Sequence, residues 1–223
     1  MTANSNLLSS LKAALPEGLS GAIFDCDGVL VNSWESNVMF YNLMRHYFGL
    51  PNMSKAEEDY VHMHTSHQSL LHILPPQFLP QLREAMQSID YMQDIVPYIK
   101  PEPGIFKLLQ ALQDAGVKLA VNTNRTTFAE RLLDYFELSS YFSLFVTAST
   151  HPPKPDPAGV LFILDSWRVE ATKVFFVGDS ALDEEAAKAA GVPLVAYCNP
   201  KLAAAVHVDD YVKFSEELCS FLA

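Results

Sequence analysis

The stretch GAIFDCDGVLVNS (residues 21–33) places two aspartates, Asp25 and Asp27, directly after a run of apolar residues. The apolar run predicts a short strand, and residues i and i+2 of an extended segment point to the same side. We therefore expect both carboxylates to face one spot, with Cys26 on the opposite side. At about 4 Å two such charges repel by roughly 4 kcal/mol in an effective dielectric of about 20. A metal ion, a bound proton or a nearby lysine must offset this repulsion.

The composition predicts a globular protein that does not bind nucleic acid. The chain has 223 residues, of which 49% are hydrophobic, so it can bury a core as one domain or as a domain with an insertion. Its formal net charge of −11 argues against nucleic acid or an anionic membrane surface as a partner, because both attract basic patches. An anionic substrate must therefore be attracted by local cations or by a bound metal ion.

Cysteine usage and hydropathy together favour a cytoplasmic protein. The cysteines are Cys26, Cys198 and Cys219. They are odd in number and lack the spacing of a metal site, which is typical of reduced thiols. No apolar run approaches the length of a membrane span. Residues 1–15 lack the pattern of a secretory signal and predict a short amphipathic helix instead.

Residues 34–96 show helical periodicity and no convincing strand. Ser54 and Glu57 have the spacing of a capping box and predict the start of one helix, whereas Pro80 is expected to kink a later one. Three prolines between residues 97 and 103 then indicate a hinge or linker.

Beyond this linker, predicted helices and strands alternate. The predicted strands are residues 117–122, 143–148, 173–178 and 193–198, and the predicted helices are residues 105–116, a helix that begins at Thr127 and Glu130, and residues 158–167, 181–191 and 215–223. Such alternation is typical of a parallel sheet with right-handed crossovers. We therefore predict an α/β fold with a Rossmann-like parallel sheet core, formed by residues 1–33 and 98–223, and an all-helical insertion of residues 34–97.

Polar residues follow four of the predicted strands at the point where each strand ends. They are Asp25 and Asp27; Thr123, Asn124 and Arg125; Lys154; and Asp179, Ser180 and Asp183. Ligands of open α/β sheets bind beyond the carboxyl ends of the strands. Carboxylates, a hydroxyl and an amine at one such edge predict a Mg²⁺ site together with groups that bind an oxyanion.

Four short motifs contain these residues: DCDGVLVNS, NTN, KPDP and GDSALDEEAA. In this order they resemble the motifs of phosphatases of the haloacid dehalogenase (HAD) superfamily, from about Gly21 to Pro200. The helical insertion after the first motif is similar to a C1-type cap, as in phosphoglycolate phosphatases. The resemblance implies a Mg²⁺-dependent phosphomonoesterase that acts on a small phosphorylated metabolite through an aspartyl-phosphate, and it favours phosphoglycolate as the substrate.

The resemblance also implies roles for individual residues. Asp25 is the expected nucleophile, Asp27 the general acid and then base, and Lys154 the cation that neutralises the transferring phosphoryl group. The implied metal ligands are Asp25, Asp27 through its backbone carbonyl, Asp179 and Asp183. Asp183 has two open roles, since it would either act on the water shell of the metal or hold Lys154.

The phosphoryl group is expected to bind Thr123 and the backbone near Gly28 and Asn124. Arg125 is a candidate for binding a substrate carboxylate or phosphate, although an exposed arginine at the start of a helix fits the sequence equally well. The histidines of residues 62–72 lack a third ligand at metal-site spacing, so they favour a surface or substrate-pocket role.

Two other functions remain open at this point. A phosphotransferase of the β-phosphoglucomutase type shares these motifs, and a non-catalytic phosphate-binding module would keep only part of the chemistry. A dehalogenase needs neither the second aspartate nor a metal, so Asp27 and Asp179 argue against it. We expect a monomer or homodimer that binds a small phosphorylated metabolite, with no nucleic-acid or membrane partner.

Overall fold

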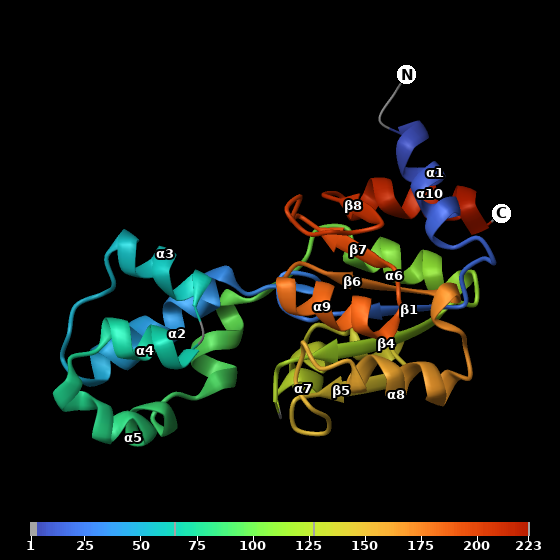
Figure 1. The fold of residues 1–223 in the computed structure, drawn as a ribbon. Coiled ribbons are helices and arrows are strands. Elements are labelled where there is room, and N and C mark those ends of the chain that lie inside the picture. The colour runs from blue at the N-terminus through green and yellow to red at the C-terminus, as the bar shows by residue number, and fades with distance from the viewer. Residues whose placement is uncertain (1–3, 65, 127, 223) are drawn as a thin grey trace. The chain divides into compact units, whose positions relative to one another are not determined.

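The computed structural model describes residues 4–64, 66–126 and 128–222 (Figure 1). The chain forms two compact units, a core unit of Met1–Val31 with Pro101–Ala223 and an insert unit of Asn32–Lys100. The division into a catalytic domain and a cap with separate roles stays a prediction. Among the described residues, no helix has both the length and the hydropathy to span a bilayer.

A six-stranded, fully parallel sheet forms the centre of the core unit, in the order β5-β4-β1-β6-β7-β8 (Figure 1). The strands are β1 (Gly21–Phe24), β4 (Lys118–Thr123), β5 (Leu144–Thr147), β6 (Val174–Gly178), β7 (Leu194–Tyr197) and β8 (Val206–Val208). The prediction of an α/β parallel sheet is therefore confirmed. Sequence reasoning missed β8, because three residues with an exposed His207 between two valines are too short to show a period.

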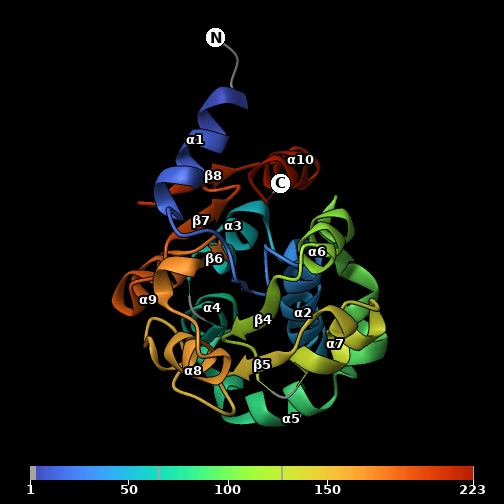
Figure 2. The same ribbon diagram turned by 90° about the vertical axis from the view of Figure 1, so that its right-hand side faces the viewer.

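Helices cover both faces of this sheet. They are α1 (Asn4–Ala14), α6 (Ile105–Asp114), α7 (Ala129–Tyr135), α8 (Ala158–Trp167), α9 (Ala181–Ala190) and α10 (Tyr211–Leu222), with 3-10 turns at Ser139–Tyr141 and Ala171–Lys173. Helices α6 and α10 pack together, whereas α8 and α9 pack on the opposite face (Figure 2). The predicted helix start at Thr127 lies outside the described residues, and α10 begins earlier than predicted.

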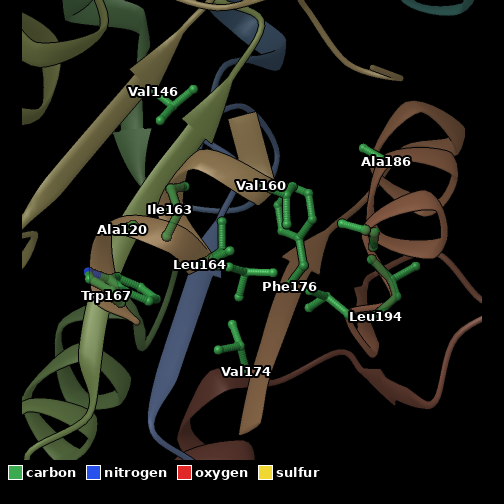
Figure 3. Packing of buried hydrophobic residues seen from close by; sticks show 14 of the residues in the cluster. Ala120, Val146, Val160, Ile163, Leu164, Trp167, Val174, Phe176, Ala186 and Leu194 are labelled. Carbon is green, nitrogen blue, oxygen red and sulfur yellow. The ribbon is translucent and has the colours of Figure 1, made fainter. Parts of the chain in front are cut away.

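Figure 3 shows the apolar core between α8, α9 and the sheet. Ile163, Leu164 and Trp167 of α8 lie against Val174 and Phe176 of β6, and all five side chains are almost completely buried. Strands β1, β6 and β7 are buried along their whole length, as expected for parallel strands with helices on both faces. This packing holds the strands in register, and so places the residues at their carboxyl ends.

The insert unit is all-helical, with α2 (Trp34–Tyr47), α3 (Lys55–Met63), α4 (Ser66–Ile73) and α5 (Leu82–Gln87). The predicted capping box at Ser54 and Glu57 is confirmed at the start of α3. The expected single helix with a kink at Pro80 is wrong. That segment is a 3-10 helix (Pro76–Gln81), α5, a π-helical turn (Tyr91–Ile95) and a 3-10 turn (Val96–Tyr98).

Two local features break this segment. Pro80 cannot donate a backbone hydrogen bond, and it lies in the 3-10 helix. The Asp90 carboxylate accepts hydrogen bonds from the backbone N–H groups of Met92 and Gln93, which starts a new turn. Two-residue strands, β2 (Val31–Asn32) and β3 (Lys100–Pro101), contain the points at which the chain passes between the two units.

Candidate active site

A cavity of about 260 Å³ opens at the carboxyl ends of the central strands of the core unit. It is lined by Asp25, Asp27, Thr123, Asn124, Arg125, Lys154, Ser180 and Leu182. The structure thus brings together residues at or after the carboxyl ends of β1, β4, β5 and β6. Asp179 and Asp183, which do not line the cavity, lie beside Asp25. The catalytic and binding roles of these residues stay predictions.

Asp25 continues the hydrogen-bond ladder of the sheet and carries a buried carboxylate. Its backbone N–H donates to the carbonyl of Val177 on β6 at 3.0 Å, so the sheet fixes the backbone that carries the side chain. Asp25 is only 8% exposed, and its Oδ1 lies 2.7 Å from Nζ of Lys154. Burial raises the pKa of Asp25 to about 7, with Asp183 adding to the rise and Lys154 opposing it.

Lys154 is the buried cation of the site, and Asn124 holds its backbone. The Asn124 side chain donates to the Lys154 carbonyl at 2.9 Å and accepts from the Lys154 N–H at 2.7 Å. The ammonium group contacts Asp183 at 2.5 Å as well as Asp25. Burial alone would lower the pKa of Lys154, but the two carboxylates outweigh it and hold the pKa above its usual value. Lys154 therefore remains charged in this site.

Asp183 is completely buried in the first turn of α9, and both of its oxygens are occupied. Oδ1 accepts from Lys154, and Oδ2 accepts from the hydroxyl of Ser180 at 2.6 Å and from its backbone N–H at 3.1 Å. Ser180 and Asp183 form a capping box. The Ser-x-x-Asp spacing could have predicted this cap.

Asp179 lies next to Asp25 and Asp183, with carboxylate oxygens of all three residues within 4.8 Å of one another. Burial and the neighbouring charges of Asp25 and Asp183 raise the pKa of Asp179 to about 7. Gly28 has a φ of +70°, and a Cβ added there would collide with the Asp179 carboxylate. The site thus gathers more negative charge than Lys154 offsets, which is the environment that a divalent cation occupies.

Asp27 and Arg125 form a bidentate ion pair. Nε of Arg125 lies 2.6 Å from Oδ2 of Asp27, and Nη2 lies 2.6 Å from Oδ1. The expected alternatives for Arg125 were a substrate contact or an exposed position, and neither anticipated this pair.

Cys26, which stands between the two aspartates in the sequence, is fully buried, and burial raises the pKa of its thiol. Burial and the raised pKa both disfavour the thiolate, which is the reactive form of cysteine.

Two further polar side chains, those of Thr123 and Asn199, form hydrogen bonds with the backbone of site residues. Thr123 is 3% exposed, and its hydroxyl accepts from the N–H of Arg125 at 3.1 Å. Asn199, which sequence reasoning missed, donates its side-chain amide to the carbonyl of Asp179 at 2.7 Å. No motif marks Asn199, because it comes after β7 in a loop without regular spacing.

Three histidines of the insert unit stack on aromatic rings. His62 stacks on Trp34, and His64 and His72 both stack on Tyr60, with ring centroids 3.7 and 3.8 Å from it. Within the described residues, no set of three clustered metal ligands includes a histidine.

We expect the metal-free protein to lose stability as the pH rises from about 4 to about 7. In the folded state Asp25 and Asp179 have pKa values of about 7, against 3.8 for an exposed carboxyl. Between these pH values the two carboxyls are ionised in the unfolded chain but still protonated in the folded chain. Raising the pH therefore favours unfolding, and the loss of folding stability levels off above pH 7, where both states are ionised. Urea unfolding in EDTA at pH 4.5 and 7.5 measures the difference, which should be on the order of a few kcal/mol.

The matched variants for this measurement are Asp179→Asn and Glu185→Gln. Each removes one negative charge from the core unit, but Glu185 is exposed on α9. Asp179→Asn should flatten the pH dependence, and Glu185→Gln should leave it unchanged. Equal slopes for wild type and Asp179→Asn would contradict the raised pKa of Asp179.

The fold and the strand-end aspartates define a hydrolase of a known family. Residues 22–197 match the profile of the haloacid dehalogenase-like hydrolases, so the chain belongs to this family, as the motifs predicted. A phosphoglycolate phosphatase of Aquifex aeolicus (strain VF5) is 33% identical over 177 residues, which cover 76% of this chain and 80% of that protein.

Two other comparisons agree with this assignment. A HAD-superfamily hydrolase of subfamily IA, variant 1, from Geobacter sulfurreducens superposes with a TM-score of 0.82 at 34% identity, over 92% of this chain and 97% of that one. A phosphoglycolate phosphatase of Pseudomonas savastanoi pv. phaseolicola is 43% identical over 96 residues, 42% of this chain. The chain spans only 35% of the length of that relative.

Proposed function

We propose that this chain is a Mg²⁺-dependent phosphomonoesterase that hydrolyses a small phosphorylated metabolite through an aspartyl-phosphate on Asp25. One observation carries the proposal. The buried Asp25 carboxylate contacts the Lys154 ammonium at 2.7 Å and lies against Asp179, at the edge of the sheet where ligands bind. Phosphoglycolate is the substrate that we favour, because the Aquifex aeolicus and Pseudomonas savastanoi relatives carry that name.

Asp25 and Asp179 would hold the metal ion. Both have raised pKa values, and oxygen ligands of this kind suit Mg²⁺. When bound, Mg²⁺ supplies positive charge that offsets these carboxylates and polarises a phosphoryl oxygen. Asp183 is better suited to hold Lys154, since its oxygens already accept from Lys154 and Ser180. The backbone carbonyl of Asp27 stays a predicted third ligand.

The chemistry proceeds in two displacements at phosphorus. In the first, a carboxylate oxygen of Asp25 forms a bond to phosphorus while the bond to the leaving oxygen breaks, and Asp27 donates a proton to that oxygen. In the second, a water molecule attacks phosphorus as Asp27 removes its proton, and the bond to Asp25 breaks. Inorganic phosphate leaves, and both aspartates return to their initial state.

The chain supplies its own cations and hydrogen-bond donors for this charge transfer. Lys154 remains charged beside Asp25, so it can stabilise negative charge that spreads over the phosphoryl oxygens. The Thr123 hydroxyl lines the cavity and can donate to a phosphoryl oxygen. Against a net charge of −11, Lys154 and the metal ion, when it is bound, would be the local positive charges that attract an anionic substrate.

Metal removal is the direct test. We expect EDTA to abolish phosphate release from phosphoglycolate and from p-nitrophenyl phosphate, and Mg²⁺ to restore it. Ca²⁺ should not substitute, because its larger and looser coordination fails to hold the carboxylate and phosphoryl oxygens in line. Asp25→Asn, purified in parallel, measures the background of contaminating phosphatases. Full turnover in excess chelator would overturn the metal-dependent mechanism.

A panel of phosphorylated metabolites tests the substrate class. Phosphoglycolate should show the highest kcat/KM, with phosphate as the product. Transfer of the phosphoryl group to an added sugar phosphate in preference to water would reassign the chain as a phosphotransferase.

A further inference from the structure

We propose that Arg125 is a positioning residue for Asp27, whose carboxylate it holds in the cavity in the orientation that proton transfer requires. The inference rests on the proposed phosphatase mechanism, in which Asp27 is the general acid and base. It assigns to Arg125 a task that acts through Asp27, in place of the direct substrate contact that the sequence suggested.

The geometry of the pair is the main observation. Two different nitrogens of Arg125 contact the two different oxygens of Asp27, both at 2.6 Å. A guanidinium fork that meets a carboxylate in this way fixes its rotation as well as its distance, and it leaves a second lone pair on each oxygen for the proton that Asp27 transfers. A single hydrogen bond would leave the carboxylate free to turn.

The fork is itself held by the ends of two strands. The backbone N–H of Arg125 donates to the hydroxyl of Thr123, the last residue of β4, at 3.1 Å. The carbonyl of Arg125 accepts from the N–H of Ala148, directly after β5, at 3.0 Å. The Arg125 side chain is only 18% exposed. The guanidinium therefore starts from a backbone that the sheet positions, and little of it is free to move into solvent.

Asp27 needs such a support more than Asp25 does. The Asp27 side chain is 39% exposed and lies beyond the end of the strand, whereas Asp25 is buried and continues the sheet ladder. The negative charge of Asp25 repels Asp27 from the position in which both must act on one phosphoryl group. The two cations of the cavity lining pair with different carboxylates. Lys154 contacts Asp25 and Asp183, whereas Arg125 contacts Asp27 and offsets its repulsion from Asp25.

The test begins with Arg125→Gln and Arg125→Lys, and with Arg131→Gln as a matched control. Arg131 is exposed on α7 of the same unit and lies over the ring of Phe128, so its loss should leave kcat and KM unchanged. Arg125→Gln should lower kcat by about 10²-fold, the cost of a misplaced catalytic group, with KM within about threefold of wild type. Arg125→Lys keeps the charge but not the fork, so it should restore only part of the rate.

The leaving group separates this role from a merely structural one. An alkyl phosphate needs a proton on its leaving oxygen, whereas the phenolate of p-nitrophenyl phosphate leaves unaided. Arg125→Gln should therefore slow phosphoenzyme formation far more with the alkyl substrate. Equal losses with both substrates, or a change confined to KM, would overturn the positioning role and return Arg125 to substrate binding.

A double-mutant cycle with Asp27→Asn decides whether Arg125 acts through Asp27. If it does, adding Arg125→Gln to Asp27→Asn should cause little further loss in the rate of phosphoenzyme formation from an alkyl phosphate, the substrate on which each single variant has a large effect. Multiplicative losses would mean that Arg125 acts on the substrate directly. Circular dichroism identifies any variant that fails to fold, and Arg125→Lys then replaces Arg125→Gln in the cycle. A wild-type protein that releases no phosphate would instead contradict the proposed function itself.

Discussion

Replacement of Asp25 by asparagine is expected to abolish turnover, by roughly 10⁴-fold or more, because the amide oxygen cannot form the acyl-phosphate. The protein should still fold. The Asp25 carboxyl is 8% exposed and has a pKa raised to about 7, so the fold already favours its neutral form. A neutral amide of the same shape should therefore leave the metal-free protein equally stable or more stable at pH 7.5 and above.

Single-turnover assays and thermal unfolding in EDTA measure these two effects on one preparation. Glu185→Gln provides the control for loss of one negative charge, and it should keep full activity, since Glu185 is exposed on α9. Activity of Asp25→Asn above a trace, with the KM of the wild type, would place the nucleophile elsewhere. A large fall in melting temperature would show that the Asp25 contact with Lys154 outweighs the cost of its burial.

Replacement of Asp27 by asparagine is expected to lower kcat by 10²–10⁴-fold, the range typical of a lost general acid or base. The metal affinity should change little, because the expected ligand is the backbone carbonyl of Asp27. The loss should be largest with alkyl phosphates and smallest with p-nitrophenyl phosphate in the first step. Calorimetric titration with Mg²⁺ and rapid-quench kinetics measure the affinity and the two rates.

The second displacement provides an independent readout of the same variant. Water still needs a base, so Asp27→Asn should accumulate phosphoenzyme when p-nitrophenyl phosphate is the substrate. Mass spectrometry after an acid quench should find the added phosphate on the peptide that contains Asp25. A variant that loses Mg²⁺ affinity and slows equally on both substrates would instead make the Asp27 side chain a metal ligand.

Much of the fold was predictable from the sequence because it depends on local pattern. Helix and strand periods between residues 105 and 198 predicted the strands β4 to β7 and the helices between them, and this alternation allows little besides a parallel sheet. Capping at Ser54 and a glycine after α6, Gly116, were also predictable from short spacings. The segment around Pro80 was predicted wrongly, since a proline shows that a helix is disturbed but not whether it kinks or ends.

The residue types of the site were equally accessible, because all strands of a parallel sheet have their carboxyl ends at the same edge. Asp25, Asp27 and Lys154 line one cavity for that reason. The motifs that contain these residues were enough to indicate the haloacid dehalogenase-like family, which the match over residues 22–197 confirms.

The sequence by itself thus determined which groups meet, and only the tertiary structure decided which of them pair. The order β5-β4-β1-β6 sets the distances between strand ends, and no local pattern encodes that order. This strand order places Lys154 in contact with both Asp25 and Asp183, and it places Arg125 in contact with Asp27. Partner choice among charged groups depends on differences of a few ångströms, since hydrogen-bonded ion pairs form only in contact. Those differences arise when the sheet and its helices pack.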